Sequence, residues 1–195
     1  DGNVKTLQTA SVGNGINVVI MGEGFVDSQH TSGLYDEVMN EAYETLFMTE
    51  PYKSFKDRFN VYSVAVVSPN MYGDTVFDLT YGGGTHIDGS ESKAFEYALK
   101  APTVNEDNIH NTLCMVIANN PRYAGTCCMF EDNSAVAYSS MSNFKYDSYA
   151  TTIQHESGGH GFGKLGDEYW YDDNKNAPSN AFADKHSLGW YSNLD

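Results

Sequence analysis

Two histidines separated by a pair of glycines place the strictest constraint on how this chain can fold. His155 and His160 stand five residues apart in the segment HESGGHGFGKLGDE. On an ideal helix, residues four apart lie about 40° from one another around the axis, whereas residues five apart lie about 140° from one another. The two imidazoles can therefore converge only if the helix is widened, as in a π-type turn. Gly158 and Gly159 favour such a backbone, because each destabilises a regular helix by about 1 kcal/mol.

The residue types in this segment are those of a catalytic zinc site. Such a site uses neutral histidine nitrogens, a third protein ligand and a free carboxylate that handles the proton of a water molecule. The frequent HExxH signature has its histidines four apart, and we interpret HExxxH as that motif with one residue inserted. Glu156 supplies the free carboxylate. The glycines after His160 would turn the chain back, which makes Asp167 the predicted third ligand and Glu168 the alternative.

Four blocks of sequence, in a fixed order, carry a resemblance to a known family. The motif block is HESGGHGFGKLGDEY, and the upstream blocks are INVVIMGEGF, TEPYKSFKDRFNVYSV and TLCMVIANNPRYAG. The upstream blocks are similar to a family's opening strand and turn, its next helix end and strand, and a further strand followed by a tyrosine-bearing loop. Together they resemble the IgA peptidase family of bacterial zinc metallopeptidases, over nearly the whole chain.

The resemblance implies a fold, a site and a function. The fold is a zincin-like α/β catalytic domain, with a mixed twisted β-sheet flanked by helices and the metal motif on a helix. His155, His160 and Asp167 would bind zinc, and Glu156 would be the catalytic base. The resemblance also implies a bacterial protein that is secreted or at the cell surface. Its substrates would be proteins or peptides, such as immunoglobulins or mucin-like glycoproteins.

Two departures from the family pattern concern the ends of the domain. Family members usually continue well beyond the position of Asp195, so we expect residues 1–195 to be a single metallopeptidase domain truncated at its C-terminus. All seven methionines precede His155. The motif is therefore followed by no Met-bearing turn of the kind that supports the zinc site in metzincins.

Composition narrows the classes of partner. The net charge is −15 and the sequence pI is about 4.5, which disfavours nucleic-acid binding because phosphates would be repelled. No run of 18 apolar residues occurs, so no membrane span is expected. The length and the 41% hydrophobic content suit one domain with a sizeable core, and we expect a monomer.

Apolar runs and helical periodicity alternate along the chain, which predicts an α/β fold. The predicted strands are residues 16–21, 60–67, 113–118 and 134–138, and the predicted helices are 31–48, 90–100 and 149–161. Residues 70–90 have a loop-like composition. The strand at 135–138 comes before the metal helix. We expect it to form the edge of the cleft, where a peptide adds as an extra strand.

The cysteines, the remaining histidines and Glu23 are weaker candidates for a role. Cys114 is expected to be a buried apolar side chain, and the sequence leaves open whether Cys127 or Cys128 pairs with it. No motif supports a catalytic thiol. Isolated histidines, expected to be solvated, are His30, His86 and His110. Glu23 is expected in a strand-end turn, with the cleft as its alternative location.

The residues after the motif offer weaker candidates. Among residues 169–171, YWY, a tyrosine could stabilise an oxyanion, but packing beneath the zinc loop is the preferred interpretation. His186 is an alternative third ligand, and an exposed helix-end position is preferred for it. Residues 172–176 alternate like the start of a calcium loop, but Ala177 stands where glycine is needed.

The sequence thus predicts a zinc-dependent endopeptidase with Glu156 as general base. The main alternative is a secreted non-catalytic binding domain with a structural or vestigial metal site. A chance pairing of the histidines on a surface turn is less consistent with the acidic residues that follow. A glycosidase using Glu156 and Asp167 as an acid/base pair would leave both histidines without a role.

Overall fold

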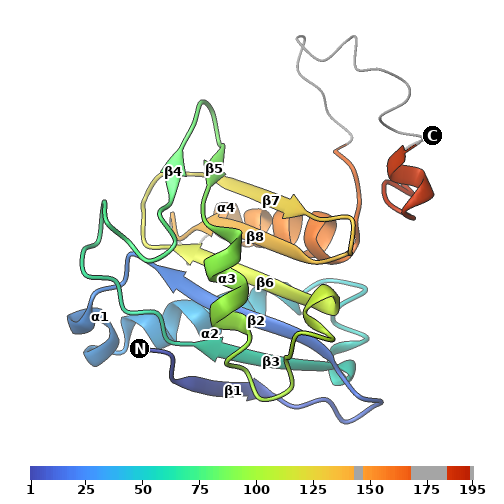
Figure 1. Cartoon of the computed structure of the whole chain (residues 1–195), viewed down its shortest axis with the longest axis horizontal. Helices are drawn as coiled ribbons and strands as arrows, with labels where there is room; N and C mark the ends of the chain where they lie inside the picture. The colour runs from blue at the N-terminus through green and yellow to red at the C-terminus, as the bar shows by residue number, and fades with distance from the viewer. Residues whose placement is uncertain (143–146, 168–183, 194–195) are drawn as a thin grey trace.

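A six-stranded mixed β-sheet forms the centre of the molecule (Figure 1) in a computed structural model that describes residues 1–142, 147–167 and 184–193. The strand order is β1-β3-β2-β6-β8-β7. The four central strands are parallel, and both edge strands run antiparallel to their neighbours. The strands are β1 (Val4–Gln8), β2 (Ile16–Glu23), β3 (Phe59–Val64), β6 (Thr112–Ala118), β7 (Gly125–Met129) and β8 (Ala135–Ser140).

The central strands are apolar because helices cover both faces of the sheet. β2 and β6 are nearly continuous apolar runs and are buried along their length, as expected for parallel strands inside an α/β fold. On one face α2 (Leu34–Leu46), α4 (Asp147–Thr152) and the π-helix η3 (Ile153–Phe162) complete a core. On the other face α3 (Glu91–Ala98) packs through Ala94 and Ala98. Figure 1 shows α3 in front of the sheet and α2 and α4 behind it.

Shorter elements connect the main ones. They are α1 (Asp27–Thr31), the 3₁₀ turns η1 (Lys56–Arg58) and η2 (Ile109–Asn111), and the two-residue strands β4 (Thr80–Tyr81) and β5 (Ile87–Asp88). The β4–β5 hairpin extends beyond the main sheet near β7 (Figure 1). It forms within a segment whose composition predicted only loop. None of the helices in the described ranges is long and apolar enough to cross a membrane.

The mixed α/β architecture and the main elements agree with the sequence prediction, but the edges of the sheet do not. The predicted helix at 31–48 corresponds to α2, which starts at Leu34, because a turn at Gly33 with a φ of 85° separates it from α1. The strand predicted as a cleft edge, residues 135–138, is wrong in position. It lies in β8, which pairs with both β6 and β7. The edge strand on this side of the sheet is β7. Its sequence is GTCCM, and the glycine and two cysteines give no clear strand pattern.

Candidate active site

The helix that carries the motif is widened throughout residues 153–162. Residues 153–162 form a π-helix that continues directly from α4. The amide of Gly163 donates to the Gly158 carbonyl at 2.9 Å, five residues back. The additional residue per turn brings residues five apart onto one side of the helix. The widening expected from the histidine spacing is therefore present.

Three donor atoms converge at this widened turn. The Nε2 atoms of His155 and His160 lie 3.1 Å apart. Asp167 Oδ1 lies 3.2 Å from each of them. Ligands at 2.0–2.1 Å around a tetrahedral zinc ion are about 3.3–3.4 Å apart. The triangle of donor atoms therefore has close to the dimensions that a zinc ion requires.

The orientation of His160 is fixed by a second contact. Its Nδ1 lies 2.7 Å from the carbonyl oxygen of Leu165, and because that oxygen can only accept, Nδ1 carries the proton. Nε2 of a neutral His160 then presents a lone pair to the triangle. This is the arrangement by which proteins orient a metal-binding histidine.

A cation suits this arrangement better than hydrogen bonding does. His160 Nε2 and the Asp167 carboxylate are both acceptors, and they face one another at 3.2 Å. Burial and the nearby His160 lower the pKa of His155. A neutral His155 has at most one Nε2 proton to share between two acceptors. The donor set of two imidazoles and one carboxylate fits zinc.

Glu156 lies beside this triangle in a largely enclosed position. It is 8% exposed, and a carboxylate oxygen lies within 4.8 Å of donor nitrogens of both histidines. Burial, with a contribution from Asp167, raises the pKa of Glu156 to about 8. A buried carboxyl group with a raised pKa is suited to exchange protons near neutral pH.

Two glycines make room for this geometry. A Cβ atom at Gly125 would lie 2.7 Å from Glu156 Oε1 and 2.6 Å from Thr152 Cγ2, so only glycine leaves the carboxylate its place. A Cβ atom at Gly161 would lie 2.6 Å from Leu113 Cδ1, so this glycine lets the π-helix approach β6 closely. Neither contact was evident from the sequence.

The triangle and Glu156 open into a cavity of about 440 Å³. One wall is formed by β7 and the tip of the β4–β5 hairpin, and the other by η3 and the segment around Asp167. Two lining residues were missed by the sequence analysis. His86, expected to be isolated and solvated, is exposed and also lines this cavity, and so does Tyr191. Both reach it through the fold, from positions far from the motif.

The cysteines form no catalytic pair. All three are free thiols, so a bond to Cys114 is not formed. Cys127 lines the cavity, but burial raises its pKa far above the usual range, and Glu156 adds to the shift. A thiol held in this protonated state is a poor nucleophile.

Other predicted candidates lie away from the cavity or outside the described residues. Glu23 accepts the Phe77 amide proton at 3.0 Å and lines a separate cavity, so its alternative location in the cleft is wrong. His186 Nε2 contacts the Tyr191 carbonyl at 3.2 Å and does not line the site cavity. Glu168, the aromatic residues 169–171 and the calcium-like run 172–177 lie outside the described residues.

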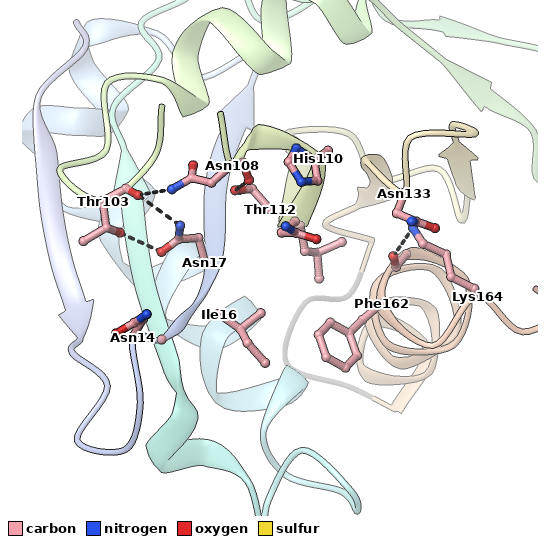
Figure 2. Close-up of a pocket in the computed structure, with 14 residues that line it drawn as sticks. Asn14, Ile16, Asn17, Thr103, Asn108, His110, Thr112, Asn133, Phe162 and Lys164 are labelled. Carbon is pink, nitrogen blue, oxygen red and sulfur yellow. Dashed lines mark hydrogen bonds between the residues drawn. The ribbon is translucent and has the colours of Figure 1, made fainter. Parts of the chain in front are cut away.

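A larger cavity of about 640 Å³ lies near the first residues of β2 and β6 (Figure 2). Its lining is rich in amides and contains no carboxylate. Several of these groups bond to one another: Thr103 donates to Asn17 Oδ1 at 2.6 Å, and Asn108 donates to the Thr103 carbonyl at 2.8 Å. Neither histidine of the motif lines it. The candidate chemistry therefore belongs to the smaller cavity.

Together, the fold and the convergent donor set define a candidate metal-dependent hydrolase. Comparison with protein families then identifies its class: residues 4–193 match the family described as IgA Peptidase M64, and the chain belongs to this family. The M64 peptidases are metallopeptidases, so we assign the chain as a protease that acts on proteins or peptides. Comparison with curated proteins gives no sequence match.

Proposed function

We propose that the chain is a zinc-dependent endopeptidase with a zincin-like catalytic domain, in which His155, His160 and Asp167 hold the metal. The observation that carries this proposal is the triangle formed by two histidine nitrogens and one Asp167 oxygen, 3.1–3.2 Å apart, at a π-helix and its exit. The dimensions and the donor types fit zinc. Asp167 is favoured over Glu168 as third ligand because its oxygen already lies in the triangle.

Glu156 is proposed as the general base and acid. Zinc, when bound, would polarise the scissile carbonyl and lower the pKa of a water molecule. Glu156 takes a proton from that water while the water oxygen forms the bond to the carbonyl carbon. The same carboxyl group then delivers the proton to the amine nitrogen as the C–N bond breaks. The space left by Gly125 keeps the carboxylate in place for both transfers.

Tyr191 is proposed to support the reaction from a position beside the exit of η3, where its amide donates to the Lys164 carbonyl at 2.7 Å. It lines the same cavity as Glu156 and both histidines. A phenolic hydroxyl there can donate a hydrogen bond to the oxyanion that develops on the carbonyl oxygen.

The substrate is proposed to lie along the cavity beside β7. The hairpin closes part of this edge, because the Gly125 amide donates to the Thr85 carbonyl at 3.0 Å. A substrate would then contact His86 and Thr126 on the same wall. We further propose that the enzyme acts outside the cell or at its surface, as the family resemblance implies.

The non-catalytic alternative is less consistent with these observations. A structural metal site needs no uncoordinated carboxylate, yet Glu156 is buried beside the triangle and Gly125 leaves space for it. Membership of a peptidase family also favours catalysis over simple binding.

The test combines metal analysis with peptide cleavage. We expect His160→Ala to lower the zinc content by about one ion per chain and to abolish cleavage of an unfolded protein substrate. His110→Ala, which alters a histidine of the larger cavity, is the matched control and should change neither. A chelator should stop cleavage, and added zinc should restore it. Cleavage that persists at full rate in His160→Ala would contradict the proposal.

A further inference from the structure

A second group of metal-ligand side chains lies on the other face of the sheet. Asp88 of β5, Glu91 at the start of α3 and Cys128 of β7 each offer a ligand atom, and these atoms all lie within 4.8 Å of one another. Glu91 and Cys128 are half-buried, and Asp88 is exposed.

Strand alternation separates this group from the proposed catalytic site. Successive side chains of a strand point to opposite faces. Cys127 packs on the η3 side, and its neighbour Cys128 packs on the α3 side. None of Asp88, Glu91 and Cys128 lines the cavity that contains His155 and His160.

A buried hydroxyl without a partner lies beneath this group. Tyr138 of β8 is 0% exposed, and its hydroxyl oxygen forms no hydrogen bond. The hydroxyl end of its ring lies under the turn between Asp88 and Glu91: a Cβ atom at Gly89 would be 2.9 Å from Tyr138 Cε1 and 3.2 Å from Cζ. Leaving such a hydroxyl unpaired costs about 1–3 kcal/mol.

Ordinary local roles account for only part of the group. Glu91 is favoured at the first turn of a helix, and Asp88 Oδ1 accepts the Gly89 amide proton at 2.9 Å, as in many turns. These roles do not explain why a thiol lies within 4.8 Å of both carboxylates while the hydroxyl of Tyr138, in the same cluster, has no partner. One bound cation would take Asp88, Glu91 and Cys128 as ligands, and a water molecule on it would give the Tyr138 hydroxyl a partner.

We propose that Asp88, Glu91 and Cys128 form a second divalent-cation site, with the Tyr138 hydroxyl beside it. The cation belongs to the zinc class, because a thiolate ligand disfavours calcium and magnesium, and carboxylates with a thiolate suit zinc. Binding replaces the Cys128 S–H proton by the metal and releases that proton to solvent. The bound ion would connect β5 of the hairpin to β7, and so would stabilise this wall of the catalytic cavity.

Cobalt binding tests this site without the first one. In a His160→Ala background, we expect Co²⁺ to bind at about one ion per chain and to give thiolate-to-cobalt charge-transfer absorption. Adding Cys128→Ser should abolish that absorption, and adding Cys127→Ser, the matched neighbour on the other face, should leave it. Glu91→Gln should weaken binding at least tenfold.

The outcomes separate this proposal from the proposed peptidase function. Absence of the absorption in His160→Ala, with circular dichroism unchanged from wild type, would overturn the second site. Absorption that survives Cys128→Ser would also overturn it. If His160→Ala does not fold, Asp167→Asn provides the same background. A variant that loses cleavage but keeps the cobalt signal has lost the proposed catalytic site only, and this result would support the second site.

Discussion

The two donor clusters beside β7 differ in how the chain assembles them. The proposed catalytic cluster comes from thirteen consecutive positions, His155 to Asp167, on one widened helix and its exit. The second cluster brings together Asp88, Glu91 and Cys128 from three separate elements. A local cluster leaves a motif in the sequence, whereas a cluster made by sheet topology leaves none.

The clusters also differ in chemistry. The first has two imidazoles, a cavity of about 440 Å³ and a buried carboxylate beside the donors. The second has a thiol in place of imidazoles, and none of its three residues lines that cavity. We therefore propose that the first cluster activates water and that the second holds a structural ion. The predictions below test this division.

The largest effect is expected for the base. Glu156→Gln keeps the shape of the side chain but removes its ability to accept a proton. We expect kcat to fall by about 10²–10⁴-fold, with the zinc content unchanged. Steady-state kinetics and metal analysis check this, with the exposed Glu106→Gln as control. A Glu156→Gln enzyme with the wild-type kcat would contradict the proposal that the first cluster, unlike the second, activates water.

A somewhat smaller loss is expected when the base is displaced. In Gly125→Ala the new methyl group would collide with Glu156 Oε1 and Thr152 Cγ2. A displacement of the catalytic carboxylate by about 1 Å lowers the rate by about 10²-fold. Gly83→Ala is the matched control, because a Cβ atom there meets nothing within 4 Å in the same cavity. Equal rates in the two variants would show that Gly125 has no positioning role.

An effect of about 10–100-fold is expected for Tyr191. Tyr191→Phe removes a hydrogen bond to the developing oxyanion. The loss should cost about 1.5–3 kcal/mol, or about 10–100-fold in kcat, while KM stays near its wild-type value. Tyr72→Phe, an exposed tyrosine outside the site cavity, provides the control. A change in KM alone would assign Tyr191 to substrate binding instead.

The smallest effect is expected at the second cluster, in metal-free protein. Tyr138→Phe removes a hydroxyl without a partner, so the free energy of unfolding should stay within about 1 kcal/mol or rise. Tyr35→Phe is the comparison: its hydroxyl donates to the Val64 carbonyl at 2.6 Å and accepts the Gly22 amide proton at 2.9 Å. That loss should cost about 1–3 kcal/mol. Denaturant titration measures both, and equal destabilisation would mean that Tyr138 has an undetected partner.

The sequence predicts those features that local spacing determines. The five-residue interval between His155 and His160 predicts the widened helix, and the apolar runs of β2 and β6 predict buried strands. The edge strands β1 and β7 are missed because short edge strands with polar or small residues carry little pattern. Since β7 was missed, β8 was wrongly placed at the edge.

Most of the cavity wall could not be predicted because it depends on tertiary contacts. His86 and Tyr191 come from distant segments, and no sequence signal relates either to the motif. The role of Gly125 follows only from its distance to Glu156. The same reason hides the second cluster, whose members are up to forty positions apart in the chain.

Anomalous diffraction at the zinc edge, from crystals of the zinc-loaded protein, tests the central claim most directly. The account predicts a peak about 2.0–2.2 Å from His155 Nε2, His160 Nε2 and an Asp167 oxygen. The π-helix should be intact around it. A regular α-helix with the two histidines facing apart, or zinc-loaded crystals with no peak at this triangle, would contradict the account.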